Sequence, residues 1–167
     1  MAKSKTSSTI NALLKLAAIP VKLNSENEGH EQLSFVVFDI GEEFFALSVE
    51  NIEGIVDCSR IAPLPSPPDG IVGITSVRGH MTLVMNLSAN HTQGASRQRL
   101  VLLKGESQLG LLADRIEDVI TLSATSVDML SKRVAEKNLQ TRWVGNNYFK
   151  NKGRVIPVID FEKLIEA

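Results

Sequence analysis

The chain has 167 residues, enough for one large domain or for two small ones that share a core. Its 18 basic and 19 acidic residues leave a formal charge of −1, so it offers no electrostatic surface for nucleic acid or for an anionic membrane. The single cysteine, Cys58, cannot form an internal disulfide and fits a reducing cytoplasm. Because no apolar run approaches the roughly 20 residues of a membrane span, the composition predicts a soluble cytoplasmic protein without direct membrane insertion.

Residues 1–33 differ from the rest and predict a flexible N-terminal extension that contains a short amphipathic helix. Four apolar residues follow helical spacing before Pro20 ends the pattern: Ile10, Leu13, Leu14 and Ala17. A secretory signal is the alternative, but Lys15 interrupts the apolar stretch and no convincing small-residue cleavage site follows. The helix would dock on its own domain or on a partner, and the sequence does not decide between them.

From Ser34 onward the pattern predicts β-structure, because the apolar runs are short and are separated by Gly, Asp, Asn and Ser turns. Ten strands are expected, at about 34–40, 44–49, 54–58, 72–77, 81–87, 99–104, 108–113, 117–122, 143–149 and 154–160. This spacing is typical of an all-β sandwich or barrel rather than of alternating strands and helices. Closure of each set of five strands into a small barrel is favoured, because an open five-stranded unit would leave exposed edges.

Three segments interrupt the strands. The proline-rich run 63–70 is stiff and cannot pair fully in a sheet, so we expect a spacer across a barrel end, with a recognition loop that presents Leu64 as the alternative. Residues 88–99 are polar and join the two halves. Residues 125–140 allow either a short helix or an irregular loop.

The chain also contains an internal repeat. Residues 46–56 align with residues 110–120, and residues 79–87 align with residues 153–161. Between these blocks, Val72-Gly73 aligns with Val144-Gly145. The repeat predicts two related β units, and two related units are suited to a protein that joins partners.

Signatures of catalysis or metal binding are lacking in the sequence. The three histidines, His30, His80 and His91, have no partner at metal-ligand spacing, and no zinc, phosphate-loop or nucleophile-elbow motif is present. Asp114 and Glu117 follow a strand and more readily begin a turn than form a catalytic pair. We therefore expect neither enzyme activity nor a cofactor or metal.

The order of landmarks over about residues 34–165 resembles the CheW-like domain of bacterial chemosensory adaptors. The most specific part is the proline-rich approach to Gly70-Ile71-Val72-Gly73, followed by Arg78-Gly79. The other matching motifs are Phe38-x-Ile40-Gly41-x-Glu43, Ala46-Leu47-x-Val49, Gly110-Leu111-Leu112-x-Asp114 and Ile156-Pro157-Val158-Ile159-Asp160.

The resemblance implies two five-stranded, SH3-like β-barrels packed on a shared core within residues 34–167, the first over about 34–90 and the second over about 97–165. It implies a non-enzymatic adaptor, in the chemotaxis type of two-component signal transduction. Such an adaptor couples the cytoplasmic tips of methyl-accepting chemoreceptors to the regulatory domain of a CheA-type histidine kinase. Individual contacts would be modest, with the multivalency of an array supplying the stability.

By the same resemblance, Arg78 and Gly79 lie near the receptor-binding groove. The structural alternative for Arg78 is an arginine before a turn that pairs with a carboxylate such as Glu53. Ile52, Ile55 and Val56 would line the adjoining groove, although core packing is the simpler interpretation for each of them. Leu64 completes the candidate protein-binding residues.

The sequence departs from the family pattern at three positions: Leu83 stands where the family has a proline, Asn86 where it has an acid, and Gly54 where a glutamate is common. These departures motivate a second hypothesis, a divergent CheW-like adaptor for surface motility or another output, with altered receptor binding. An enzyme or small-molecule binder is the third and would require a deep pocket with converging polar groups.

Overall fold

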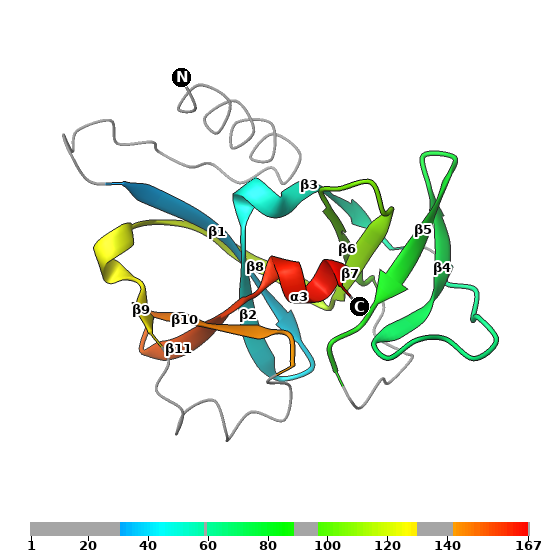
Figure 1. Cartoon of the computed structure of the whole chain (residues 1–167). Helices are drawn as coiled ribbons and strands as arrows, with labels where there is room; N and C mark the ends of the chain where they lie inside the picture. Colours follow the sequence, from blue (N-terminus) through cyan, green and yellow to red (C-terminus); the bar gives the residue numbers. More distant parts are fainter. Residues whose placement is uncertain (1–30, 59, 89–96, 130–141, 167) are drawn as a thin grey trace.

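The computed structural model describes residues 31–58, 60–88, 97–129 and 142–166 (Figure 1). The amphipathic helix expected in the N-terminal extension therefore lies outside the described residues. So do most of the segment 125–140 and the greater part of the linker 88–99.

All ten predicted strands are present, with boundaries that differ by a few residues. They are β1 (Gln32–Ile40), β2 (Glu43–Ser48), β3 (Ile52–Asp57), β4 (Ile71–Val77), β5 (His80–Met85), β6 (Arg99–Leu103), β7 (Leu109–Ala113), β8 (Arg115–Ser123), β10 (Val144–Asn151) and β11 (Arg154–Ile159). The additional elements are a two-residue strand β9 (Asp128–Met129), the 3-10 turns η1 (Val49–Asn51) and η2 (Ala124–Ser126), and a C-terminal helix α3 (Phe161–Ile165).

The sequence pattern does not predict helix α3. Its N-cap is Asp160, whose side chain accepts a hydrogen bond from the backbone N–H of Glu162 at 3.1 Å. Helix α3 has only five residues, too few for the helical periodicity of apolar residues to be visible.

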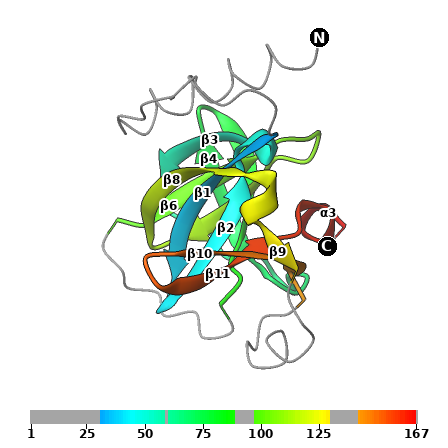
Figure 2. The ribbon, with the colours of Figure 1, turned by 90° about the vertical axis from the view of Figure 1, so that its left-hand side faces the viewer.

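The strands form two sheets that repeat the same order. One has the order β8-β1-β2-β11-β10 with β9 added at its edge, and we call it unit one, together with η1, η2 and α3. The other has the order β3-β6-β7-β5-β4, and we call it unit two. Unit one faces the viewer in Figure 2, and the two units lie side by side in Figure 1. The expected all-β fold of two five-stranded units is confirmed.

The division expected at the linker, with barrels over 34–90 and 97–165, does not describe these sheets. Unit two is the continuous stretch 52–113, and unit one is built from the chain on both sides of it. Two parallel strand pairings explain why the sheets do not follow the two halves of the chain. Val84 of β5 pairs with Gly110 of β7, and Val158 of β11 pairs with Ala46 of β2, so each pairing joins one half of the chain to the other. These two residue pairs are equivalent in the repeat, which therefore extends to strand register.

Three apolar clusters fill the molecule. Unit one has an interior cluster around Phe35 and Phe149, and unit two has one around Val84 and Leu100. The largest cluster takes residues from both units, including Phe38 and Leu111, and confirms the shared core. The interiors of both units are thus packed with side chains.

Gly73, in the most specific motif, is required where another segment of the chain crosses β4 closely. The proline-rich segment crosses the edge of β4, where Ala62 and Ile74 exchange two backbone hydrogen bonds of 2.8 Å. A Cβ atom on Gly73 would collide with the carbonyl oxygen of Ala62, so only glycine allows this crossing. The segment also covers part of an otherwise open sheet edge.

Candidate functional site

Arg78 and Gly79 form the two-residue turn between β4 and β5, closed by the pair Val77 and His80. Both turn residues have positive φ, 50° for Arg78 and 84° for Gly79, as in the type I′ turns that suit the twist of a hairpin. A Cβ on Gly79 would meet no atom within 4 Å. Arg78 is exposed, and the β4–β5 hairpin that carries it lies on the side of unit two away from unit one (Figure 1).

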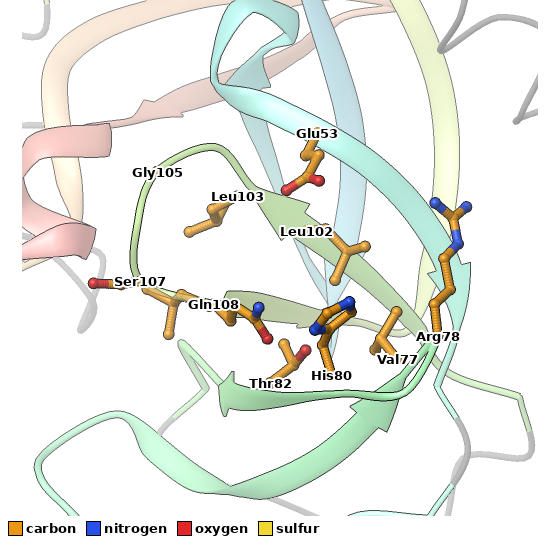
Figure 3. Close-up of a pocket in the computed structure, with 11 residues that line it drawn as sticks. Glu53, Val77, Arg78, His80, Thr82, Leu102, Leu103, Gly105, Ser107 and Gln108 are labelled. Atoms are coloured by element: carbon orange, nitrogen blue, oxygen red, sulfur yellow. The ribbon is translucent and has the colours of Figure 1, made fainter.

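A cavity of about 110 Å³ lies against the turn end of this hairpin (Figure 3). Its wall combines the ends of β3, β4, β5 and β6 with the segment that leads into β7. The lining residues are Glu53, Val77, Arg78, His80, Thr82, Leu102, Leu103, Gly105, Ser107, Gln108 and Leu109. We call it the Thr82 cavity, because Thr82 is the most buried polar residue that lines it.

The charged groups of the Thr82 cavity are not paired with each other. Among the described residues, no ion pair joins Arg78 to Glu53, although both line the cavity. The structural alternative for Arg78, pairing with Glu53, is therefore not formed. A guanidinium and a carboxylate are left exposed at the rim of one small polar cavity.

The predicted aliphatic residues lie deeper. Ile52 is 0% exposed in the shared core, so its side chain cannot contact a partner, and the core interpretation holds. Ile55 packs against the shared core, whereas Val56 packs against the interior of unit two. Leu64 is half-buried against the shared core, which favours the spacer over the recognition loop.

Three polar residues of the cavity, His80, Thr82 and Gln108, are not identified as binding residues by any sequence motif. The repeat carries a signal for two of them. Thr82 aligns with Ile156, and Gln108 aligns with Phe44, so polar residues stand where the other copy has apolar ones. They meet because β5 and β7 pair in parallel, with Leu83 opposite Leu109.

Among the departures from the family pattern, Leu83 and Gly54 each adjoin a residue that lines this cavity, whereas Asn86 lies beyond the opposite end of β5. The backbone N–H of Leu83 donates to the carbonyl of Gln108 at 2.8 Å, a hydrogen bond that proline cannot make. Asn86 is buried, and its side-chain oxygen accepts from the backbone N–H of Ser88 at 2.8 Å. Gly54 is buried in β3 next to the exposed Glu53.

Two carboxylates, Asp39 and Asp114, hold the junction between the units. Buried Asp39 accepts from the backbone N–H of Arg115 at 2.6 Å and from its guanidinium at 2.8 and 3.0 Å. These hydrogen bonds, with the charge of Asp39, raise the pKa of Arg115 above its ordinary value. Asp114 accepts from the N–H of Gly41 and from Gln98. Asp39 and Asp114 thus fix the turn into β8, as expected for Asp114.

A second, broader hollow of about 630 Å³ lies on unit one, between the start of β1, the start of β10 and helix α3. It shares no lining residue with the Thr82 cavity. Asp160 and Glu162 give it an acidic rim. The molecule therefore has separate hollows on its two units.

The part of the chain that the structure describes contains no cluster of His, Cys, Asp or Glu that could hold a metal ion. None of its helices is long and apolar enough to span a membrane.

A duplicated all-β module with filled interiors and a surface hollow on each unit is suited to binding partner proteins at its surface. The CheW-like domain family model matches residues 34–167, so the chain belongs to that family. Its members are adaptors and scaffolds of chemotaxis rather than enzymes, in agreement with the prediction of a non-enzymatic protein.

Individual relatives are distant but cover most of the chain. A protein named "Chemotaxis protein CheW" from Thermotoga maritima is 25% identical over 142 residues, 81% of this chain and 89% of the relative. The protein of that name from Klebsiella aerogenes is 26% identical over 155 residues, 87% of each. A crystal structure of the scaffolding protein TtCheW from Thermoanaerobacter tengcongensis matches with a TM-score of 0.65 and 21% identity. That match covers 78% of this chain and 90% of the other, and supports the fold.

Proposed function

We propose that this chain is a cytoplasmic adaptor that couples the tip of a methyl-accepting chemoreceptor to the regulatory domain of a CheA-type histidine kinase. The observation that carries the proposal is the family match over residues 34–167. The relatives are named for chemotaxis, and TtCheW is described as a scaffolding protein. The two separate hollows support the proposal, because an adaptor needs two surfaces that can be occupied at once.

We assign receptor contact to the exposed residues around the Thr82 cavity, namely Arg78, Gly79 and Glu53. Ile55, Val56 and Leu64 do not line the cavity and are kept as candidates on the family resemblance alone. Arginine is among the residues enriched at binding hot spots. The turn holds Arg78 in a fixed backbone conformation, which lowers the entropy lost when it binds.

A second candidate is a divergent CheW-like adaptor for another output, such as surface motility. It is favoured by Leu83 in β5 and Gly54 in β3, which adjoin residues of the Thr82 cavity, and by Asn86, which follows the far end of β5. In this alternative the chain binds the kinase but has lost ordinary receptor binding.

A pull-down separates the two candidates. The full-length chain is immobilised and offered a receptor cytoplasmic fragment and the cognate kinase, together and separately. Capture of both supports the coupling adaptor. Capture of the kinase alone supports the divergent adaptor, and capture of neither contradicts both.

A further inference from the structure

Thr82 of β5 is an unusual residue in the wall of the Thr82 cavity. It is only 4% exposed, yet its hydroxyl makes no hydrogen bond to any residue that the structure describes. Its cross-strand neighbour Thr75 is equally buried, but the hydroxyl of Thr75 donates to the carbonyl of Arg60 at 2.9 Å. A buried hydroxyl without a partner costs roughly 1–3 kcal/mol, so the Thr82 hydroxyl is available to a group that enters the cavity.

The polar side chains next to Thr82 also lack hydrogen-bond partners among the described residues. Thr82 lies between Gln108 and His80 in the cavity (Figure 3). No side-chain hydrogen bond or ion pair to the described residues occupies Gln108, His80, Glu53 or Arg78. Both donors and acceptors are therefore available around one small space.

The repeat shows that the fold does not require these polar groups. In unit one the positions of Thr82, Gln108 and His80 hold Ile156, Phe44 and Arg154. Ile156 packs in the interior cluster there, and the guanidinium of Arg154 stacks on the ring of Phe44, 4.5 Å from its centroid. The same architecture is thus closed by apolar and stacking contacts in one unit and left polar in the other.

The size and charge of the cavity define what fits. At about 110 Å³ it is smaller than a drug-sized pocket. Since a water occupies about 30 Å³ in the liquid, the space suits a group of roughly three or four heavy atoms. An ammonium group would be attracted by Glu53 but repelled by Arg78, and a carboxylate would be attracted by Arg78 but repelled by Glu53. A neutral group that both donates and accepts meets neither repulsion.

We propose that the Thr82 cavity is a binding site for a primary carboxamide, supplied by an asparagine or glutamine side chain of a protein partner. The Thr82 hydroxyl would donate to the amide oxygen, and the amide N–H groups would donate to the side-chain oxygen of Gln108 or to Glu53 on the facing wall (Figure 3). Only the identity of the partner, the receptor tip, rests on the proposed function. The site itself rests on the cavity, the unpartnered hydroxyl and the comparison with unit one.

The test measures the binding of three small probes of similar size, propionamide, propionate and propylammonium, to the full-length chain at one pH. Amide chemical shifts near Thr82 and Leu109 report occupancy. We expect saturable shifts with propionamide and an affinity about tenfold weaker for each charged probe, the effect of one mismatched buried hydrogen bond. Absence of saturable shifts, or equal binding of the three probes, would overturn the site.

Two threonine variants provide the matched pair. Thr82→Val replaces the hydroxyl by a methyl group of similar size and is expected to weaken propionamide binding about tenfold. Thr75→Val makes the same change across the hairpin and is expected to leave that affinity unchanged. An unaltered affinity in Thr82→Val would refute the assignment of the hydroxyl.

The source of the amide is tested with N-acetyl-glutamine methylamide against free glutamine. Tighter binding of the capped residue supports a protein side chain, and tighter binding of the free amino acid contradicts it. Propionamide binding without capture of a receptor fragment would remove the proposed partner and keep the site. Receptor capture without propionamide binding would remove the site and keep the proposed function.

Discussion

The two β units of this molecule share strand order, register and hairpin geometry, but they differ in what their equivalent positions expose. Lys152-Gly153 forms the turn of unit one with φ values of 50° and 75°, nearly the values at Arg78-Gly79 in unit two. The side chains next to the two turns differ. In unit one Arg154 stacks on Phe44 and fills the space, whereas unit two has a polar cavity there. The backbone features that both units share are those that the fold requires. The equivalent positions at which their side chains differ are therefore the candidates for binding.

The close approach of the proline-rich segment is the largest steric difference between the units. Gly73 and Gly145 are equivalent in the repeat, but a Cβ on Gly145 would find its nearest atom, the carbonyl oxygen of Val158, at an acceptable 3.4 Å. Gly73→Ala collides with backbone and should lower the free energy of unfolding by roughly 3 kcal/mol, measured by urea unfolding.

Gly145→Ala is the matched control and should cost less than about 1 kcal/mol, since nothing must move to admit a methyl group. Equal losses in the two variants would show that the crossing at Ala62 does not constrain β4.

The second difference lies in the parallel pairings that join the halves of the chain. Leu83, Val84 and Met85 all pair with β7, whereas in unit one only Val158 pairs with β2, next to Pro157, which has no N–H to donate. Leu83→Pro copies the unit-one residue into unit two and removes the 2.8 Å hydrogen bond to Gln108. It should cost roughly 2 kcal/mol by thermal or urea unfolding, because a backbone carbonyl loses its donor.

Leu83→Ala keeps the N–H and removes only a partly exposed side chain, so it should be milder than the proline variant. If alanine proves as costly as proline, the side chain and not the hydrogen bond stabilises this pairing.

These differences also mark the limit of prediction from sequence. The strands were predictable because turn residues and short apolar runs are local signals. The exchange of strands between the two halves of the chain was not predictable. It depends on the pairing of β5 with β7 and of β11 with β2, which joins residues that are distant in the chain. Arg78-Gly79 could be found by its motif, but Thr82 and Gln108 could not be joined to it without that parallel pairing. The interpretation of Ile52 as core needed only its aliphatic character.

Arg78 and Lys152, the basic residues in the equivalent turns of the two units, test which unit faces the receptor. Arg78→Ala should weaken capture of a receptor cytoplasmic fragment at least about tenfold, the effect of losing one hot-spot arginine. Its melting temperature should stay nearly unchanged, because no ion pair to the described residues is lost.

Lys152→Ala is the control, because Lys152 has the same turn position and the same φ of 50° in unit one. It should leave receptor capture intact. A loss of stability with normal capture in Arg78→Ala would make the arginine structural, and equal losses of capture in both variants would remove the distinction between the units.

The smallest expected effect on stability is at Thr82 itself. Thr82→Ile installs the residue that unit one carries at Ile156, where it is buried in an intact interior. Because the hydroxyl of Thr82 has no hydrogen bond to the described residues, its removal sacrifices no contact. Loss of the unpartnered hydroxyl stabilises and the fitting of a larger side chain destabilises by a similar amount, so the free energy of unfolding should change by less than about 1 kcal/mol.

Binding should respond quite differently, since the larger side chain occupies the space that the carboxamide needs and removes a donor. We expect Thr82→Ile to abolish propionamide binding while unfolding in urea like the parent chain. A large destabilisation would mean that unit two needs a polar residue for folding, and the contrast with unit one would then reflect packing rather than recognition.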